Sequence, residues 1–232
     1  MYEVVRNGKR STNVGVMISK RPSIPSPEYV YEEINIPGRD GKIYRENGTV
    51  QDITVSISFV FISDPQRWQE RFREVKKWLL AKKDDRLFLG DDPGFFYKVK
   101  HTSIGESERK VIESGEFTAD FICEGYQYLE DGVEEYEIKD ILYNPYKTCH
   151  PTYLITGEGM CTLNVNGNLM RANVGQNIVI NTDLMLSYRN NGEIQNTAVT
   201  GDYDGMYLKE GDNQVLISNG FDLRVIPNWR CL

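Results

Sequence analysis

Few residues of this 232-residue chain are suited to acid–base or metal chemistry, and they are scattered. The two histidines are His101 and His150. Neither has a serine or cysteine in an elbow-like turn beside it, so the sequence gives no local support for a nucleophile activated by a base. Cys149 adjoins His150, but the pair would bind a metal only with two distant partners. We expect neither a catalytic nucleophile nor a metal site.

Acidic residues occur in pairs at 84–85, 91–92 and 134–135, and flank Tyr203 as Asp202 and Asp204. Two carboxyl groups about 5 to 10 Å apart across a cleft would suit glycoside hydrolysis. A turn between strands explains Asp202 and Asp204 more simply, because aspartate and glycine favour turns. The loop also lacks the spaced ligands of an EF-hand calcium site. The chain is therefore predicted to be no enzyme and to need no cofactor.

The four cysteines, Cys123, Cys149, Cys161 and Cys231, fit no zinc spacing. The first residues lack the order of a signal peptide, which predicts folding in a cytoplasm with reduced thiols. Cys123 and Cys161 fall on apolar alternations, where cysteine acts as a small core residue. No run of about 18 apolar residues occurs, so we expect no membrane insertion.

The net charge of −7 is spread along the chain. Eight acids against six bases after residue 145 leave −2 there and −5 before it. No basic stripe is present, which argues against tight nucleic-acid binding. A mildly acidic surface would let DNA pass without binding, because like charges repel.

The elements that would position these residues are mostly strands. Between 49 and 62, apolar side chains at every second position from Ile53 to Phe61 predict a strand with one buried face. A helix is predicted to follow, with Asp64 as N-cap and Pro65 in its first turn. Trp68 and Trp78 on this helix would suit a ligand cage, but we favour packing on a sheet. Strands at 86–89, 95–99 and 117–123 complete an α+β domain.

A second domain begins after two prolines interrupt regular structure, at Pro145 and Pro151. We place the domains at 1–145 and 146–232. Asn166-Gly167 predicts a type I′ hairpin that pairs residues 163 with 170, 162 with 171 and 161 with 172. Short runs at 178–180, 184–188, 206–208, 215–218 and 223–226, without helical periodicity, predict a β-sandwich.

Several motifs in a fixed order carry a resemblance to a known family. They are IPGRDG at 36–41, LNVNG at 163–167, INTD at 180–183, GDY at 201–203 and PNWR at 227–230. With the strand–Asp64-Pro65–helix unit, they make the chain similar to the distal tail (Dit) proteins of bacteriophages with long, non-contractile tails. The resemblance implies a mainly β fold of two domains. The first would be β-rich and ring-forming with one helix, and the second a galectin-like β-sandwich.

The resemblance also implies a structural role at the tail tip of the virion. Six copies in a ring, or two such rings stacked on each other, would surround a channel for DNA. The ring would join the tail-tube protein to a tail-associated lysin or tip protein, and receptor-binding proteins are a further candidate partner. We expect the loops of residues 1–145 that face the channel to be neutral or acidic.

Within this picture the segment Pro37, Gly38, Arg39, Asp40 and Gly41 is a candidate subunit interface. Glycine and proline predict an exposed turn that presents two opposite charges. In a ring, the same loop would meet the same neighbouring patch at every interface. The alternative is an ordinary surface turn with solvated charges.

A second hypothesis makes the chain a carbohydrate-binding adhesin that acts through its second domain. It requires aromatic side chains exposed over a groove, for which Tyr188, Tyr203 and Tyr207 are the candidates. Tyrosines on a sandwich more often pack with a solvated hydroxyl. Saccharide binding is therefore the alternative hypothesis.

Overall fold

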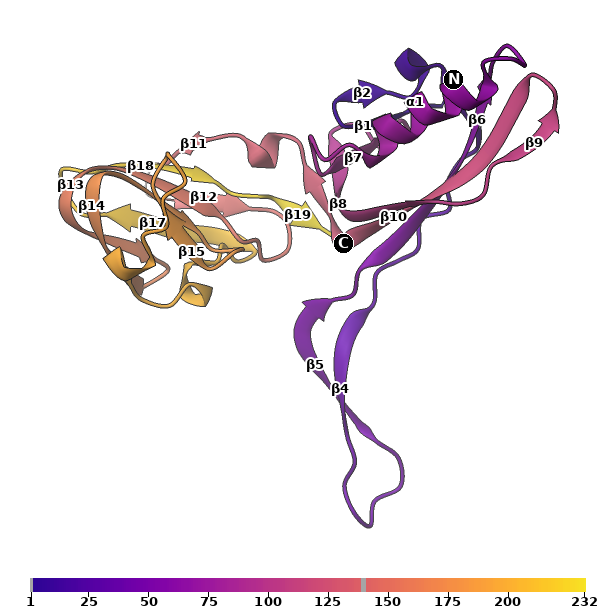
Figure 1. Cartoon of the computed structure of the whole chain (residues 1–232). Coiled ribbons are helices and arrows are strands. Elements are labelled where there is room, and N and C mark those ends of the chain that lie inside the picture. Colours follow the sequence, from indigo (N-terminus) through magenta and orange to yellow (C-terminus); the bar gives the residue numbers. More distant parts are fainter. Residues whose placement is uncertain (1, 139–140) are drawn as a thin grey trace. The chain divides into compact units, whose positions relative to one another are not determined.

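The computed structural model describes residues 2–138 and 141–232, and the chain forms two compact units (Figure 1). The first unit runs to Gln127 and includes Leu232, and the second runs from Tyr128 to Cys231. The boundary drawn at residue 145 from the prolines thus falls inside the second unit. The reason is strand pairing, because residues 136–137 and 141–144 pair with strands near the C-terminus.

The first unit is built on one antiparallel sheet with the strand order β2-β1-β7-β8-β10-β6-β3, and β9 also pairs with β10. The 3₁₀ turn Thr12–Val14 precedes β3. The strands are β1 Val4–Arg6, β2 Lys9–Arg10, β3 Val16–Lys20, β6 Ile53–Ile62, β7 Arg86–Leu89, β8 Phe95–Ile104, β9 Glu108–Val111 and β10 Ser114–Leu129.

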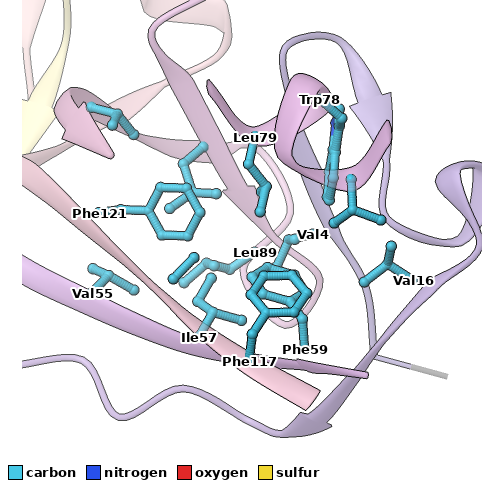
Figure 2. Close-up of a cluster of buried hydrophobic side chains, with 14 of the residues drawn as sticks. Val4, Val16, Val55, Ile57, Phe59, Trp78, Leu79, Leu89, Phe117 and Phe121 are labelled. Carbon is cyan, nitrogen blue, oxygen red and sulfur yellow. The ribbon is translucent and has the colours of Figure 1, made fainter. Parts of the chain in front are cut away.

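The core of this unit lies between the sheet and its helix, α1 Trp68–Leu80 (Figure 2). The predicted alternation holds, since every second residue of β6 from Ile53 to Phe61 is buried. Trp68 and Trp78 are only 5% and 7% exposed, so they pack in the core and form no ligand cage. Removing such apolar surface from water is the main stabilising term.

The start of the helix differs from the prediction. Asp64 is not the N-cap: its Oδ1 accepts a hydrogen bond from the Gln66 N–H at 2.9 Å in the turn before the helix, and the N-cap position is Arg67. Residues 65–67 form a turn, and Arg67 has φ −103° and ψ 6°, outside the helical region. The helix therefore begins at Trp68 and not at Pro65.

Two strands of the first unit form a separate hairpin, which we call the arm: β4 Tyr29–Ile34 and β5 Ile43–Val50 (Figure 1). β4 and β5 pair only with each other, with one register shift between Tyr29 and Tyr31. The sequence patterns did not predict these two strands.

The second unit is a curled antiparallel sheet around its own core. The strand order is β11-β18-β13-β14-β15, while β17 pairs with β12 and β13, and β16 pairs with β14. The 3₁₀ turns are Asp131–Val133, Asn196–Ala198 and Asp204–Met206. The strands of this sheet are β11 Tyr136–Glu137, β12 Ile141–Asn144, β13 Thr152–Val165, β14 Asn168–Asn181, β15 Leu186–Tyr188, β16 Val199–Thr200, β17 Gly211–Ile217 and β18 Asp222–Ile226; the last strand, β19 Arg230–Cys231, pairs with β10.

The predicted hairpin is present with the predicted register. Leu163 lies opposite Met170, and both turn residues have positive φ, 52° at Asn166 and 89° at Gly167. The run at 206–208, expected to be a strand, instead begins within the 3₁₀ turn Asp204–Met206. Met206 and Leu208 are both buried, so their spacing imitates a strand. No helix in the described ranges is long and apolar enough to cross a membrane.

Candidate interaction sites

The predicted interface loop lies at the tip of the arm, where it connects β4 to β5. Its five residues, 37–41, are all exposed. Gly38 and Gly41 have φ of 81° and 80°, a conformation that glycine adopts without strain. The Arg39 N–H closes the turn on the Ile36 carbonyl at 3.2 Å. The structure thus forms the turn that the sequence predicted, and its role in an interface remains a prediction.

The arm has little core of its own. Tyr31 and Tyr44 meet edge to face at 6.4 Å, yet they remain 50% and 60% exposed. An isolated two-stranded hairpin is marginally stable in water. At its base, the Gln51 N–H donates to the Glu28 carbonyl at 2.8 Å. Beyond this base the arm exposes strand edges and tyrosine rings.

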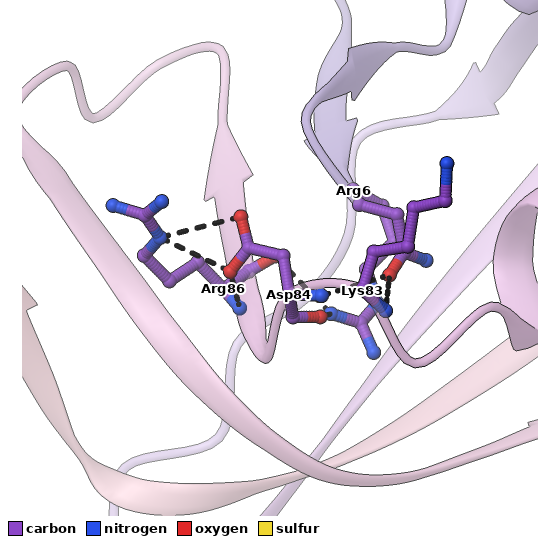
Figure 3. Close-up of polar contacts among 5 residues, drawn as sticks. Arg6, Lys83, Asp84 and Arg86 are labelled. Atoms are coloured by element: carbon purple, nitrogen blue, oxygen red, sulfur yellow. Dashed lines mark hydrogen bonds and ion pairs between the residues drawn. The ribbon is translucent and has the colours of Figure 1, made fainter. Parts of the chain in front are cut away.

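The second candidate is a cleft of about 890 Å³ between the end of α1 and β8. It contains Asp84 and His101, which the sequence had singled out for possible chemistry. The Asp84 carboxylate accepts a hydrogen bond from Arg86 Nε at 3.0 Å (Figure 3). Burial acts to raise the pKa of Asp84, but the hydrogen bonds from Arg86 outweigh it and hold that pKa below its usual value. Asp84 is therefore an ion-pair partner and not a catalytic acid.

Arg6 lines this cleft and is only 5% exposed. Its Nη1 donates to the main-chain carbonyls of Asp84 and, at 3.3 Å, Arg86. Burial lowers the pKa of the guanidinium, against the opposing effect of Asp84 and Asp85. Neither composition nor motifs singled out Arg6 as a candidate site residue. The sequence feature that marked this cleft was the charged run at 82–86, directly after the helix.

In the second unit, His150 is held by two side chains. Its Nδ1 lies 2.9 Å from Asp183 Oδ1, and its Nε2 lies 3.0 Å from Arg230 Nη2. Arginine can only donate, so Nε2 accepts and the proton sits on Nδ1, facing Asp183. Both ring nitrogens are engaged, which leaves no lone pair for a metal or a substrate proton. Within the described ranges, no group of three His, Cys, Asp or Glu residues could hold a metal ion.

The three candidate tyrosines have different settings. The Tyr207 ring stacks on His150 at 4.0 Å. The Tyr203 hydroxyl lies 2.6 Å from Ser187 Oγ, and Tyr188 is half-buried on β15. A cleft of about 220 Å³ on this unit is lined by residues of β13, β14 and β18, and by none of the three tyrosines.

The fold and these surfaces define a class: a mainly β chain of two units with one helix, whose exposed features are an arm and a charged cleft. A solved structure with this fold is that of SPP1 Dit, a hub adsorption apparatus protein of phages that infect Gram-positive bacteria. The match covers 97% of this chain and 98% of that chain, with a TM-score of 0.61 and 14% sequence identity. This likeness confirms the resemblance at the level of the fold. No protein-family model and no curated protein matches the sequence.

Proposed function

We propose that this chain is a structural protein of a phage tail hub. The observation that carries the proposal is the fold it shares with SPP1 Dit over nearly the full length of both chains. Six copies would form a ring at the distal end of the tail, or twelve copies two stacked rings. The first unit, which runs to Gln127, would form the ring, and the second unit, Tyr128–Cys231, would be a galectin-like domain outside it.

The arm supplies the physical reason for assembly. It exposes its strand edges and tyrosine rings, and a neighbouring copy would cover them. A ring places the same contact at each of its interfaces, so a modest contact energy is repeated around a closed assembly. In this arrangement the loop 37–41 would be an interface element.

The partners follow from the position of such a ring in the virion. It would join the tail-tube protein to a tail-associated lysin or tip protein, and would present sites for receptor-binding proteins. DNA would pass through the central channel without specific binding, consistent with the net charge of −7. The chain would be made in the cytoplasm of the bacterial host and act at the tail tip.

The mass of the purified chain in solution tests the proposal. Light scattering is expected to give about 160 kDa, six times the 26.7 kDa of one chain, or twice that value for two rings. A 26.7 kDa particle at every concentration up to the solubility limit would contradict a self-assembling ring.

The adhesin alternative gains no specific support from the tyrosines, since the cleft on their unit is lined by other residues. We expect titration with host cell-wall saccharides to show no saturable binding by the second unit. Saturable binding that is lost in a Tyr207→Ala variant would instead favour the adhesin.

A further inference from the structure

The cleft at Arg6 holds buried donors that nothing in the described part of the chain satisfies. The Nε atom of Arg6 and the Oγ1 atom of Thr102 are both buried without a hydrogen-bond partner. Both residues line the cleft. A buried polar group without a partner destabilises the fold, and a charged group does so more strongly. Lys82 and Lys83 add positive charge to the same cleft.

A strand edge runs along the same cleft. β7 begins at Arg86, opposite Lys98 of β8. One further main-chain bond, from the Val99 N–H to the Asp85 carbonyl at 2.7 Å, extends the pairing. Successive residues of a strand direct their main-chain N–H and C=O groups to opposite edges. His101 and Ser103 therefore direct these groups to the same edge as Val99. No strand among the described residues pairs with that part of the edge.

We propose that the cleft binds an extended acidic segment as an added strand on β8, and that this segment is β4 of a second copy of the chain. An added strand would satisfy the main chain of His101 and Ser103. A carboxylate on it would lie over Arg6 and between Lys82 and Lys83. This inference rests on the proposed function and names a contact that would build the ring.

Three features of β4 make it the occupant. Its sequence, YVYEEI, is rich in strand-forming residues, and β5 covers only one of its edges. It carries two adjacent glutamates, of which Glu33 is engaged by Lys42. Glu32 has no ion pair within the described ranges and is exposed. Glu32 is therefore the carboxylate available to a neighbouring cleft, and the charges of the two surfaces are complementary.

Charge reversal in the full-length chain tests this contact. Lys82→Glu/Lys83→Glu and, separately, Glu32→Lys are each expected to raise the concentration needed for assembly about tenfold or more, which corresponds to about 1.4 kcal/mol. Combining the three changes in one chain is expected to restore assembly to within about threefold of the wild type. Arg6 is left unchanged because it also holds the main chain at 84 and 86.

Glu33→Lys is the matched control, since neighbouring side chains on a strand point to opposite faces. It is expected to change assembly less than Glu32→Lys does. The proposed contact would be refuted if the Glu32→Lys variant assembled at the same concentration as the wild type, or if the combined variant showed no rescue. Neither result would contradict the ring itself.

A synthetic peptide of residues 28–36 gives a second measurement that does not depend on assembly. Titrated into the full-length Glu32→Lys chain, whose own β4 is expected to leave the clefts open, it is expected to bind about tenfold more tightly than the same peptide with Glu32→Gln. It is also expected to lose affinity for the Lys82→Glu/Lys83→Glu chain. If the wild-type chain is monomeric, the hub proposal fails, but peptide binding would still support the cleft. No difference between the two peptides would refute the inference in either case.

Discussion

Asn7 joins the first strand to the end of the helix, and its replacement should destabilise the first unit. The residue is buried and has φ 52° in the Asn7-Gly8 turn between β1 and β2. Its Nδ2 donates to the Trp78 carbonyl at 2.8 Å, and its Oδ1 accepts from the Lys83 N–H at 3.2 Å. A weaker contact, at 3.4 Å, comes from the Asp84 N–H.

The expected magnitude follows from these contacts. Two net hydrogen bonds of about 1 kcal/mol each give a loss of about 2 kcal/mol for Asn7→Gly, which keeps the turn free of strain. Asn7→Ala loses the same hydrogen bonds and also holds alanine in the left-handed region, which costs about 1 kcal/mol more than glycine there. The alanine variant should therefore be less stable than the glycine variant, although glycine is normally the worse residue for stability.

Urea unfolding followed by tryptophan fluorescence measures this difference. Trp68 and Trp78 report on the first unit, and Trp229 in the second unit serves as an internal control. With a slope of about 2 kcal/mol per molar urea, the midpoint of the first unit should fall by about 1 M for Asn7→Gly and 1.5 M for Asn7→Ala. Equal midpoints for the two variants would refute the backbone argument, and midpoints unchanged from wild type would refute the network.

Four further outcomes are expected. Tyr153→Phe removes a buried 2.8 Å hydrogen bond to a main-chain carbonyl, so the free energy of unfolding of the second unit should fall by about 1 to 2 kcal/mol in urea titrations. Gly167→Ala, at φ 89°, should cost that unit about 1 to 2 kcal/mol, whereas Gly167→Asn should cost less, since asparagine tolerates this region. Burial raises the pKa of Cys123 and Cys149 to about 12, so a thiol reagent at pH 8 should modify the half-buried Cys231 first and leave these two until the chain is unfolded. Because the unfolded thiols ionise near pH 9 and the folded ones near pH 12, the stability these two groups contribute should be lost between those values, which urea titrations at pH 8 and pH 10.5 would detect.

Local rules predicted the elements whose residues all favour one structure. The Asn166-Gly167 hairpin has its turn residues and its apolar pairs in agreement, so one register satisfies both. The β6 strand has one buried face over five alternate positions, from Ile53 to Phe61. In both cases the sequence pattern and the tertiary burial coincide, and prediction from sequence succeeds for that reason.

The features that were not predicted correctly from the sequence depend on contacts between distant residues, which no local sequence pattern contains. The arm strands bury little, so no hydrophobic periodicity marks them. The domain boundary follows from β11 and β12 pairing with strands far along the chain, which two prolines do not reveal. In the run at 206–208, Met206 ends a 3₁₀ turn, and both Met206 and Leu208 are buried. Two buried apolar residues separated by one position give the same sequence pattern as a strand.

The candidate sites divide in the same way. The loop 37–41 could be predicted as an exposed turn, because glycine and proline determine it locally. The Arg6 cleft could not, since it brings together β1, the end of α1 and β8, whose residues lie far apart in the sequence. Only the charged run at 82–86 marked its position.

Electron cryomicroscopy of the purified assembly tests the central claim most directly. We expect closed rings with six-fold symmetry, a central channel, and each arm against a neighbouring copy. Particles without six-fold symmetry, or rings in which the arms contact no neighbour, would contradict it.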